Sequence, residues 1–166
     1  MLVDEQDKEL GTMEKLQAHR EGKLHRAISV FIFNSEKKLL LQKRAANKYH
    51  SANLWTNTCC SHPRPNEKPL NAATRRLHEE MGIKCELKHM FNFTYLVKFE
   101  NNLSENEFDY VFFGFSDDFP KPDSGEVSEW KYADMKEIET QIRQNPKQFT
   151  EWFKLIFARI KNHMEK

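Results

Sequence analysis

Cysteine is scarce in this sequence, and its few copies are poorly arranged for cross-linking. Three cysteines occur in 166 residues, and two of them, Cys59 and Cys60, are neighbours. An odd count with an adjacent pair provides no disulfide framework and suits a reducing compartment, so we expect a cytoplasmic protein. Glycine is scarce as well, and the five glycines form no Gly-rich loop of the kind that binds a flavin or a nucleotide.

The charge balance and the short apolar runs exclude further classes. The formal net charge is +1, which gives no sequence-wide basic field for nucleic acid. The longest apolar runs have the length of a strand and not of a transmembrane helix, and the acidic first ten residues lack the apolar core of a signal peptide. Repeats and Gly/Ser linkers are missing too. We therefore expect one domain over residues 1–166 that binds neither nucleic acid nor membrane and is a monomer.

The apolar pattern predicts strands in four regions. β-Branched and aromatic residues at 25–34, followed after a short polar turn by the apolar run at 38–45, predict a hairpin. Residues 53–62 are expected to form a strand that runs into a loop. Apolar side chains alternate from Phe91 to Phe99, and residues 106–117 predict another strand.

Helical spacing appears in three other segments. Between Pro69, which suits the first turn of a helix, and Gly82, which suits its C-terminal cap, apolar residues recur every three or four positions. Residues 134–146 and 146–164 also predict helices. The last one carries an apolar stripe made of Phe149, Trp152, Phe153, Ile156, Phe157 and Ile160. Strands and helices in mixed order predict an α/β or α+β sandwich.

Two pairs of acidic residues are placed where they could do chemistry. On a helical wheel Glu80 lies at the edge of the core face marked by Leu77, whereas Glu79 lies nearly opposite and should face water. Glu105 and Glu107 are two residues apart at the start of the last predicted strand, so both carboxylates should point to one face if strand pairing begins there. Two carboxylates side by side repel each other unless a cation or a proton sits between them.

Histidines could complete a metal site with these carboxylates. His19, His25 and His62, together with the two strand carboxylates, could supply the whole shell of a divalent ion. The alternative is that each histidine is an ordinary surface or core residue, because the three are scattered over a long stretch of the chain. The spacing of these residues does not decide between a metal site and ordinary histidines.

Other candidate residues have simple structural explanations as well. Cys60 could be a small buried apolar residue, or an acid, base or nucleophile if a histidine or a metal lay beside it. Trp152 belongs to an aromatic stripe and could simply be core. The cations could be solvated surface charges, or could converge on a phosphorylated ligand; they are Lys15, Arg44, Lys48 and Arg76.

The segment SHPRPNEKPLNAATRRLHEEMGI, which begins at Ser61, resembles a Nudix box, G-x5-E-x7-R-E-U-x-E-E-x-G-U. It departs from that pattern at Ser61, which stands in place of Gly, and at Arg76, which stands in place of Glu. The matching positions are Glu67, Arg75, Leu77, Glu79, Glu80, Gly82 and Ile83. The missing Glu counts against pyrophosphate hydrolysis, because Nudix hydrolases bind metal through several helix carboxylates.

Four further motifs, in order along nearly the whole chain, resemble those of type I isopentenyl-diphosphate isomerases. They are GTMEKLQAH from Gly11, WTNTCCSHP from Trp55, ENE from Glu105 and FTEW from Phe149. The resemblance implies a Nudix-like mixed β-sheet sandwich flanked by helices. It also implies a metal-dependent 1,3 proton shift that turns isopentenyl diphosphate into dimethylallyl diphosphate, with no flavin.

The same resemblance assigns roles to individual residues. It implies that Cys60 and Glu107, the latter with Tyr95 beside it, move protons, that Trp152 faces the hydrocarbon, and that Glu80 helps to hold an Mg2+ ion bound with the diphosphate. It implies diphosphate binding by Lys15, Arg44, Lys48 and Arg76. It further implies a second divalent ion, Mn2+, Mg2+ or Zn2+, held by His19, His25, His62, Glu105 and Glu107.

Two other functions compete with the isomerase. A Nudix-type diphosphate hydrolase is supported by the box from Glu67 to Ile83, but not by Arg76 or by the CCSHP segment. A non-catalytic domain stabilised by a structural metal would favour four soft ligands, commonly with cysteine. Two carboxylates beside a cluster of Arg and Lys fit that site poorly, so the isomerase is the favoured function.

Overall fold

Strand β3 (His25–Phe33) lies at the centre of the computed structural model, which describes residues 1–99 and 102–164. Strand β8 (Ser104–Phe115) pairs with it in parallel along its whole length, and β7 (Leu87–Lys98) pairs antiparallel with the far side of β8. All residues of β3 but one are buried. A parallel strand that is covered on both faces has no solvent-exposed face that would need polar side chains. This explains why most of the β3 sequence is apolar.

Three strands share the other edge of β3. In order along that edge they are β1 (Leu2–Val3), β6 (Cys59–Ser61) and β4 (Leu39–Arg44). Strand β4 meets β3 only at Phe33 and Leu39, and then diverges to pair with β9 (Val127–Ala133) and β5 (Trp55–Thr56). The short strand β2 (Glu9–Gly11) pairs with β1. The predicted hairpin therefore exists at its turn, but its two strands separate to make room for β6.

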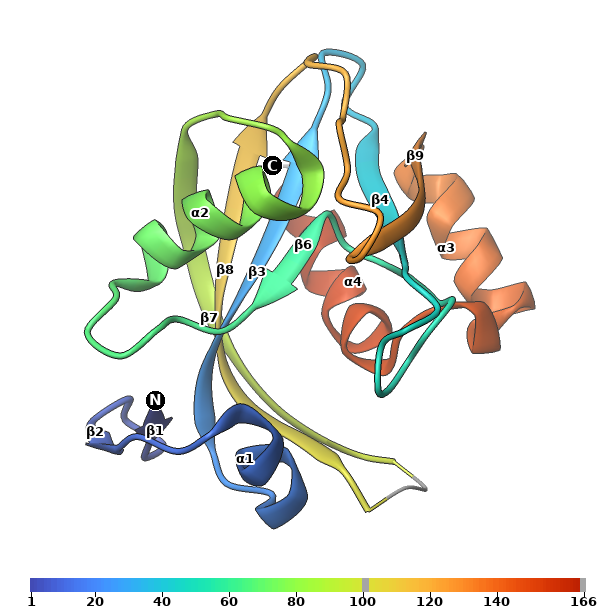
Figure 1. The fold of residues 1–166 in the computed structure, drawn as a ribbon. Coiled ribbons are helices and arrows are strands. Elements are labelled where there is room, and N and C mark those ends of the chain that lie inside the picture. The colour runs from blue at the N-terminus through green and yellow to red at the C-terminus, as the bar shows by residue number, and fades with distance from the viewer. Residues whose placement is uncertain (100–101, 165–166) are drawn as a thin grey trace.

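Helices cover both faces of the sheet (Figure 1). The apolar residues of α2 (Pro69–Met81) pack on Ile28, Val30 and Ile32, and those of α4 (Glu151–Met164) pack on Phe31 and Phe33. Successive side chains of β3 thus point to opposite layers. The predicted α+β fold, a mixed sheet between helices, is confirmed. Helix α1 (Lys15–Glu21) lies at the base of the sheet and α3 (Met135–Gln144) lies beside β9.

The predicted central helix is observed as α2, with Pro69 in its first turn and Gly82 as a left-handed C-cap at φ 69°. Its apolar residues Ala73, Leu77 and Met81 are fully buried. None of the described helices is long and apolar enough to cross a membrane.

Two predicted elements are corrected by the structure. The last helix does not begin at Pro146, because residues Pro146–Gln148 form a 3-10 turn (η1) and Phe149 is extended, where it bridges to Trp55. Residues 53–62 form two short strands, β5 and β6, and not one. No sequence pattern predicted β1, β2 and β9, which are short or carry many polar residues.

Candidate active site

Side chains of the WTNT segment, residues 55–58, bridge β3 and β4 where the two strands separate. The hydroxyl of Thr58 accepts from the backbone N–H of Ile32 at 2.9 Å and donates to the carbonyl of Leu40 at 2.7 Å. The amide of Asn57 donates to the carbonyls of Val30 and Cys59. Buried backbone groups need partners, and these side chains supply them where the strands no longer pair. This anchoring fixes the start of β6.

The two neighbouring cysteines on β6 point to opposite sides of the sheet. Cys59 is fully buried in the layer that α2 covers, whereas Cys60 packs against the layer that α4 covers. Alternation along a strand therefore presents only Cys60 to the space between the sheet and α4. Helix α4 is tied to the same region, because the backbone N–H of Thr150 donates to the carbonyl of Trp55 at 3.0 Å.

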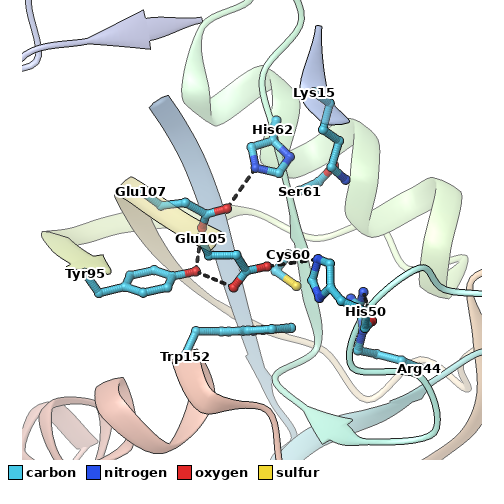
Figure 2. A pocket seen from close by; sticks show the side chains of 10 residues that line it. All are labelled: Lys15, Arg44, His50, Cys60, Ser61, His62, Tyr95, Glu105, Glu107 and Trp152. Atoms are coloured by element: carbon cyan, nitrogen blue, oxygen red, sulfur yellow. Dashed lines mark hydrogen bonds and ion pairs between the residues drawn. The ribbon is translucent and has the colours of Figure 1, made fainter. Parts of the chain in front are cut away.

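Cys60 lines a cavity of about 30 Å³ between β6, β8 and α4 (Figure 2). Most of the predicted site residues meet there. The cavity is lined by Lys15, Arg44, His50, Cys60, Ser61, His62, Tyr95, Glu105, Glu107 and Trp152. Cys60 and Glu107 come from strands that pair with opposite edges of β3, so the cavity lies over β3 between them.

Four potential metal ligands converge beside this cavity. One ligand atom from each of His19, His25, His62 and Glu107 lies within 4.8 Å of all the others. The side chains come from α1, from the start of β3, from the residue that follows β6 and from β8. The cluster is buried, with the His62 side chain its most exposed member at 19%.

The imidazole nitrogens in this cluster are oriented as metal ligands require. Nδ1 of His19 lies 3.0 Å from the carbonyl oxygen of Ser104, and Nδ1 of His25 lies 2.8 Å from that of Lys23. A ring that donates from Nδ1 keeps a lone pair on Nε2. Nε2 of His19 is buried without a hydrogen-bond partner, and Nε2 of His25 lies 3.2 Å from Nε2 of His62. A cation between these nitrogens would satisfy all of them.

Burial favours the neutral form of two cluster histidines, which is the form that binds metal. It lowers the pKa of His62 to about 3, with help from the positive charge of Lys15. Burial and the neighbouring His25 also lower the pKa of His19. A donor set of imidazoles and a carboxylate fits a divalent ion.

The two strand carboxylates share the hydroxyl of Tyr95 but differ in their surroundings. That hydroxyl lies 2.6 Å from Glu107 and 3.3 Å from Glu105. Burial alone would raise the pKa of Glu107, but its hydrogen bonds with His25 and His62 outweigh this and hold the pKa well below its usual range. Burial and the charge of Glu107 raise the pKa of Glu105 well above its usual range.

Glu105 lies outside the four-residue cluster. Its Oε1 atom lies 3.3 Å from Nε2 of His50, and its other oxygen faces Tyr95. The predicted common face of Glu105 and Glu107 is observed. Only Glu107, however, directly contacts the histidines of the cluster, with its Oε1 2.9 Å from Nε2 of His62.

Cys60 and Tyr95 both hold their protons at neutral pH. Burial raises the pKa of the Cys60 thiol to about 12, and burial with the two carboxylates raises the pKa of Tyr95 well above its usual range. Trp152 forms another wall of the cavity and is 3% exposed. The guanidinium of Arg44 lies 5.3 Å from the centre of the Trp152 ring.

A second cavity, of about 90 Å³, adjoins the first and gathers the predicted cations. Lys15, Arg44, Cys60 and Ser61 line both cavities. The other residues that line the second cavity are Gln42, Lys48, Tyr49, Arg76, Glu80 and Glu126. The four cations thus converge and are not scattered surface charges.

Acidic residues hold two of these cations in place. Nη2 of Arg76 lies 2.6 Å from Glu80 and 3.2 Å from Glu126, and Lys48 also pairs with Glu126. Burial alone would lower the pKa of Arg76, but its acidic partners raise it. Glu80 is buried, as the helical wheel predicts, whereas the Glu79 side chain is 37% exposed.

Comparison with known proteins places this arrangement in a family. The NUDIX domain family matches residues 23–153. The chain is 53% identical over 165 residues to the isopentenyl-diphosphate Delta-isomerase of Pectobacterium atrosepticum, which covers 99% of this chain and 92% of that protein. It is 52% identical over 160 residues to isopentenyl-diphosphate Delta-isomerase 1 of Aromatoleum aromaticum, at 96% and 90% coverage. The chain belongs to the isopentenyl-diphosphate Delta-isomerase family.

A solved structure supports the fold assignment of this isomerase-family chain. A Deinococcus radiodurans protein superposes with a TM-score of 0.78 at 18% identity, covering 95% of this chain and 96% of that one. An identity this low shows a shared fold and nothing more.

Sequence reasoning missed several residues of this isomerase-family site. His50 lies in the loop after β4, where no periodicity marks it, and Glu126 lies in the loop before β9. Asp109 lies beside the site and not among the residues that line it: it is buried two residues beyond Glu107, and burial raises its pKa well above the usual range. The strand alternation that predicted a common face for Glu105 and Glu107 could also have found Asp109. No comparable signal existed for His50.

Proposed function

We propose that this protein converts isopentenyl diphosphate to dimethylallyl diphosphate by protonation and deprotonation. One observation carries the proposal. A half-buried thiol and a buried carboxylate–phenol pair line one small cavity, and this cavity shares four lining residues with a second one that gathers the cations. The first brings two proton-transfer groups to one space beside an indole ring, and the second suits a diphosphate.

The chemistry needs an acid and a base on a nearly inert alkene. A proton added to the terminal carbon gives a tertiary carbocation, and removal of a proton from the methylene on the diphosphate side gives the new double bond. We assign these two transfers to Cys60 and to the Glu107–Tyr95 pair, which flank the cavity. Every atom is accounted for, because one proton enters and another leaves.

Trp152 has a physical role in this scheme. An indole face stabilises a nearby cation through its quadrupole, by about 0.5–2 kcal/mol. The same carbocation would react with water, so we expect the site to close over the substrate. The ring therefore stabilises the intermediate and helps to enclose it.

The charged residues have corresponding assignments. We propose that the diphosphate binds to Lys15, Arg44, Lys48 and Arg76, with Glu80 helping to hold an accompanying Mg2+ ion. We propose that a second divalent ion, Mn2+, Mg2+ or Zn2+, is held by His19, His25, His62, Glu105 and Glu107. An ion there would fix the Glu107 carboxylate and polarise its surroundings. The chemistry requires no flavin.

A diphosphate hydrolase is the second candidate, because the chain has the Nudix fold and much of the box. Arg76 is the observation against it. Its guanidinium pairs with Glu80, so a cation replaces one box carboxylate and neutralises another. That pairing leaves less negative charge for the metals on which Nudix hydrolases depend.

The test is to incubate the protein with isopentenyl diphosphate and Mg2+ in deuterated water and to follow the products by NMR. We expect dimethylallyl diphosphate with deuterium in a methyl group and an intact diphosphate. Free phosphate from nucleoside or other diphosphates, without deuterium exchange, would support the hydrolase. Metal binding without either reaction would leave a structural metal domain.

A further inference from the structure

His50 is a buried residue of the cavity that the proposed mechanism does not use. It lies in the loop between β4 and β5, and its side chain is 6% exposed. The ring stacks on Phe99 with centroids 5.0 Å apart and meets the indole of Trp152 edge-on at 5.8 Å. Such packing fixes the plane of the imidazole, so its ring nitrogens have defined directions.

One ring nitrogen is directed at Glu105. Nε2 of His50 lies 3.3 Å from Oε1 of Glu105, and the Tyr95 hydroxyl lies 3.3 Å from Oε2 of the same carboxylate (Figure 2). The two carboxylate oxygens are thus each held by a different side chain. A carboxylate held at both oxygens cannot rotate freely.

The opposite side of the imidazole is held as well. Nδ1 of His50 lies 3.3 Å from the hydroxyl of Ser51, and the His50 carbonyl accepts from Nη2 of Arg44 at 3.2 Å. The Ser51 hydroxyl can donate to Nδ1, which leaves the proton on Nε2, the ring nitrogen that approaches Glu105. The loop therefore places a polar N–H group beside the carboxylate.

Glu105 needs such a partner because of its neighbour. It shares a strand face with Glu107, and the two carboxylates contact the same Tyr95 hydroxyl. Repulsion between the two carboxylates would turn the Glu105 side chain away from Glu107. His50 supplies the opposing attraction from the side of Trp152.

We propose that His50 is a positioning residue, which holds the Glu105 carboxylate beside the His19, His25, His62 and Glu107 cluster. This proposal rests on the proposed function. In this scheme the loop between β4 and β5 has two tasks. Lys48 binds the diphosphate, and His50 orients the Glu105 carboxylate beside the metal site.

Three variants test the proposal. His50→Phe keeps the aromatic packing but removes the N–H group, and His50→Gln keeps an N–H group on a side chain of similar length. The control, His89→Phe, makes the same change from histidine to phenylalanine at an exposed position. Each is titrated with Co2+ after metal removal, with the visible absorption spectrum as readout. The kcat and KM for isopentenyl diphosphate are then measured, and thermal unfolding checks that each variant folds.

We expect His50→Phe to lower both kcat and Co2+ affinity by about 10–100-fold, the range found when a partner of a metal ligand is lost. Its KM should change little, because the cations are untouched. His50→Gln should recover most of both losses, and His89→Phe should match the parent protein.

Two results would overturn the proposal. Wild-type kcat, Co2+ affinity and spectrum in His50→Phe would show that the N–H group does not matter. Equal losses in His50→Phe and His50→Gln would show that the shape of the ring matters instead. A parent protein that fails to isomerise would reject the proposed function, and the Co2+ titration would still decide whether His50 positions Glu105.

Discussion

Cys59 and Cys60 have the same side chain and opposite environments. Cys59 is buried under α2, and of the two thiols only that of Cys60 lines the cavity. The pairing of β6 with β3 fixes this difference, because a slip of one residue in register would exchange the two thiols. The chemistry of the site therefore depends on one strand register.

Replacing Cys60 by Ala should abolish isomerisation and leave diphosphate binding near normal. The thiol is one of the two proton carriers that we propose, whereas the charges proposed to bind the diphosphate belong to other side chains, which the substitution leaves in place. Turnover is measured by NMR and binding by calorimetry. Cys59→Ala is the matched control: it should cost about 1 kcal/mol of stability through lost packing and retain activity. Activity in Cys60→Ala would remove the thiol from the mechanism.

Arg76→Ala should raise KM by about 10–100-fold, since a lost charge-assisted hydrogen bond costs about 1.5–3 kcal/mol. The substitution also leaves the buried Glu80 without its cation partner. The control is Arg75→Ala on the same helix, where the side chain pairs with Glu67 and Glu79 outside the cavity. That variant should lose stability with an unchanged KM. Steady-state kinetics distinguishes them, and an unchanged KM in Arg76→Ala would make it a structural arginine.

At the scale of elements, α2 is fixed at both ends by specific contacts. At its C-terminus the loop before β9 docks on the helix, with backbone N–H groups of Lys121 and Asp123 donating to the carbonyls of Met81 and Glu80. The docked loop carries Glu126 to Arg76. The end of the helix thus helps to build the cation cavity.

Gly82→Ala should destabilise the protein by about 2–4 kcal/mol. The residue has φ 69°, which costs an L-residue about 1–2 kcal/mol, and an added Cβ would lie 2.8 Å from the carbonyl oxygen of Lys121. Gly22→Ala is the control, with φ 62° and only the movable Ser104 hydroxyl nearby. Chemical denaturation should show the larger loss at Gly82. Equal losses of stability in the two variants would mean that the docked loop shifts at little cost to accommodate the added methyl group.

The N-terminal end of α2 makes stability depend on acid pH. Glu67 accepts two hydrogen bonds from Arg75, at 2.7 Å each, and these with the backbone N–H of Arg64 lower its pKa to about 2. A lowered pKa stabilises the fold above the unfolded-state value of about 4.5, and this contribution is lost as the pH falls towards 2.

Glu67→Gln should therefore be less stable than the parent at pH 7 and should lose less stability between pH 4.5 and 2. Denaturation curves at several pH values measure this. Glu79→Gln, at a more exposed partner of Arg75, should show a smaller effect at neutral pH. Parallel curves for the parent and Glu67→Gln would mean that the Arg75 pair does not stabilise the fold.

At the scale of the whole molecule, the histidine cluster joins parts of the chain that are far apart in sequence. His19 lies in α1, His62 follows β6 and Glu107 lies in β8. A ligand that binds only the folded state stabilises it by mass action. An ion in this cluster would hold the N-terminal segment against the central sheet.

Removing divalent metal should therefore lower the melting temperature by several degrees. The expected stabilisation is about 2.7 kcal/mol when free metal exceeds its Kd a hundredfold. Calorimetry with and without a chelator measures it, and adding Mn2+, Mg2+ or Zn2+ back compares the ions. In Glu107→Gln the chelator should have almost no effect. An unchanged melting temperature in the parent protein would contradict a metal in the cluster.

Local periodicity fixed much of this protein from the sequence alone. It placed α2 between Pro69 and Gly82, turned Glu80 inward and Glu79 outward, and put Glu105 and Glu107 on one strand face. These outcomes depend only on how a side chain points from its own helix or strand, which the backbone geometry of that element sets. The family motifs then singled out residues such as Cys60 as candidates where periodicity alone left the choice open.

The tertiary structure alone decided which of these side chains meet. It gathered three histidines with Glu107, left Glu105 outside that cluster beside His50, and brought Glu126 to Arg76. The segments concerned are joined by apolar burial and sheet pairing over long sequence separations, and no local pattern records such contacts. His50 shows this most clearly, because it lies in a loop without periodicity and becomes part of the site only when α4 and β8 pack around it.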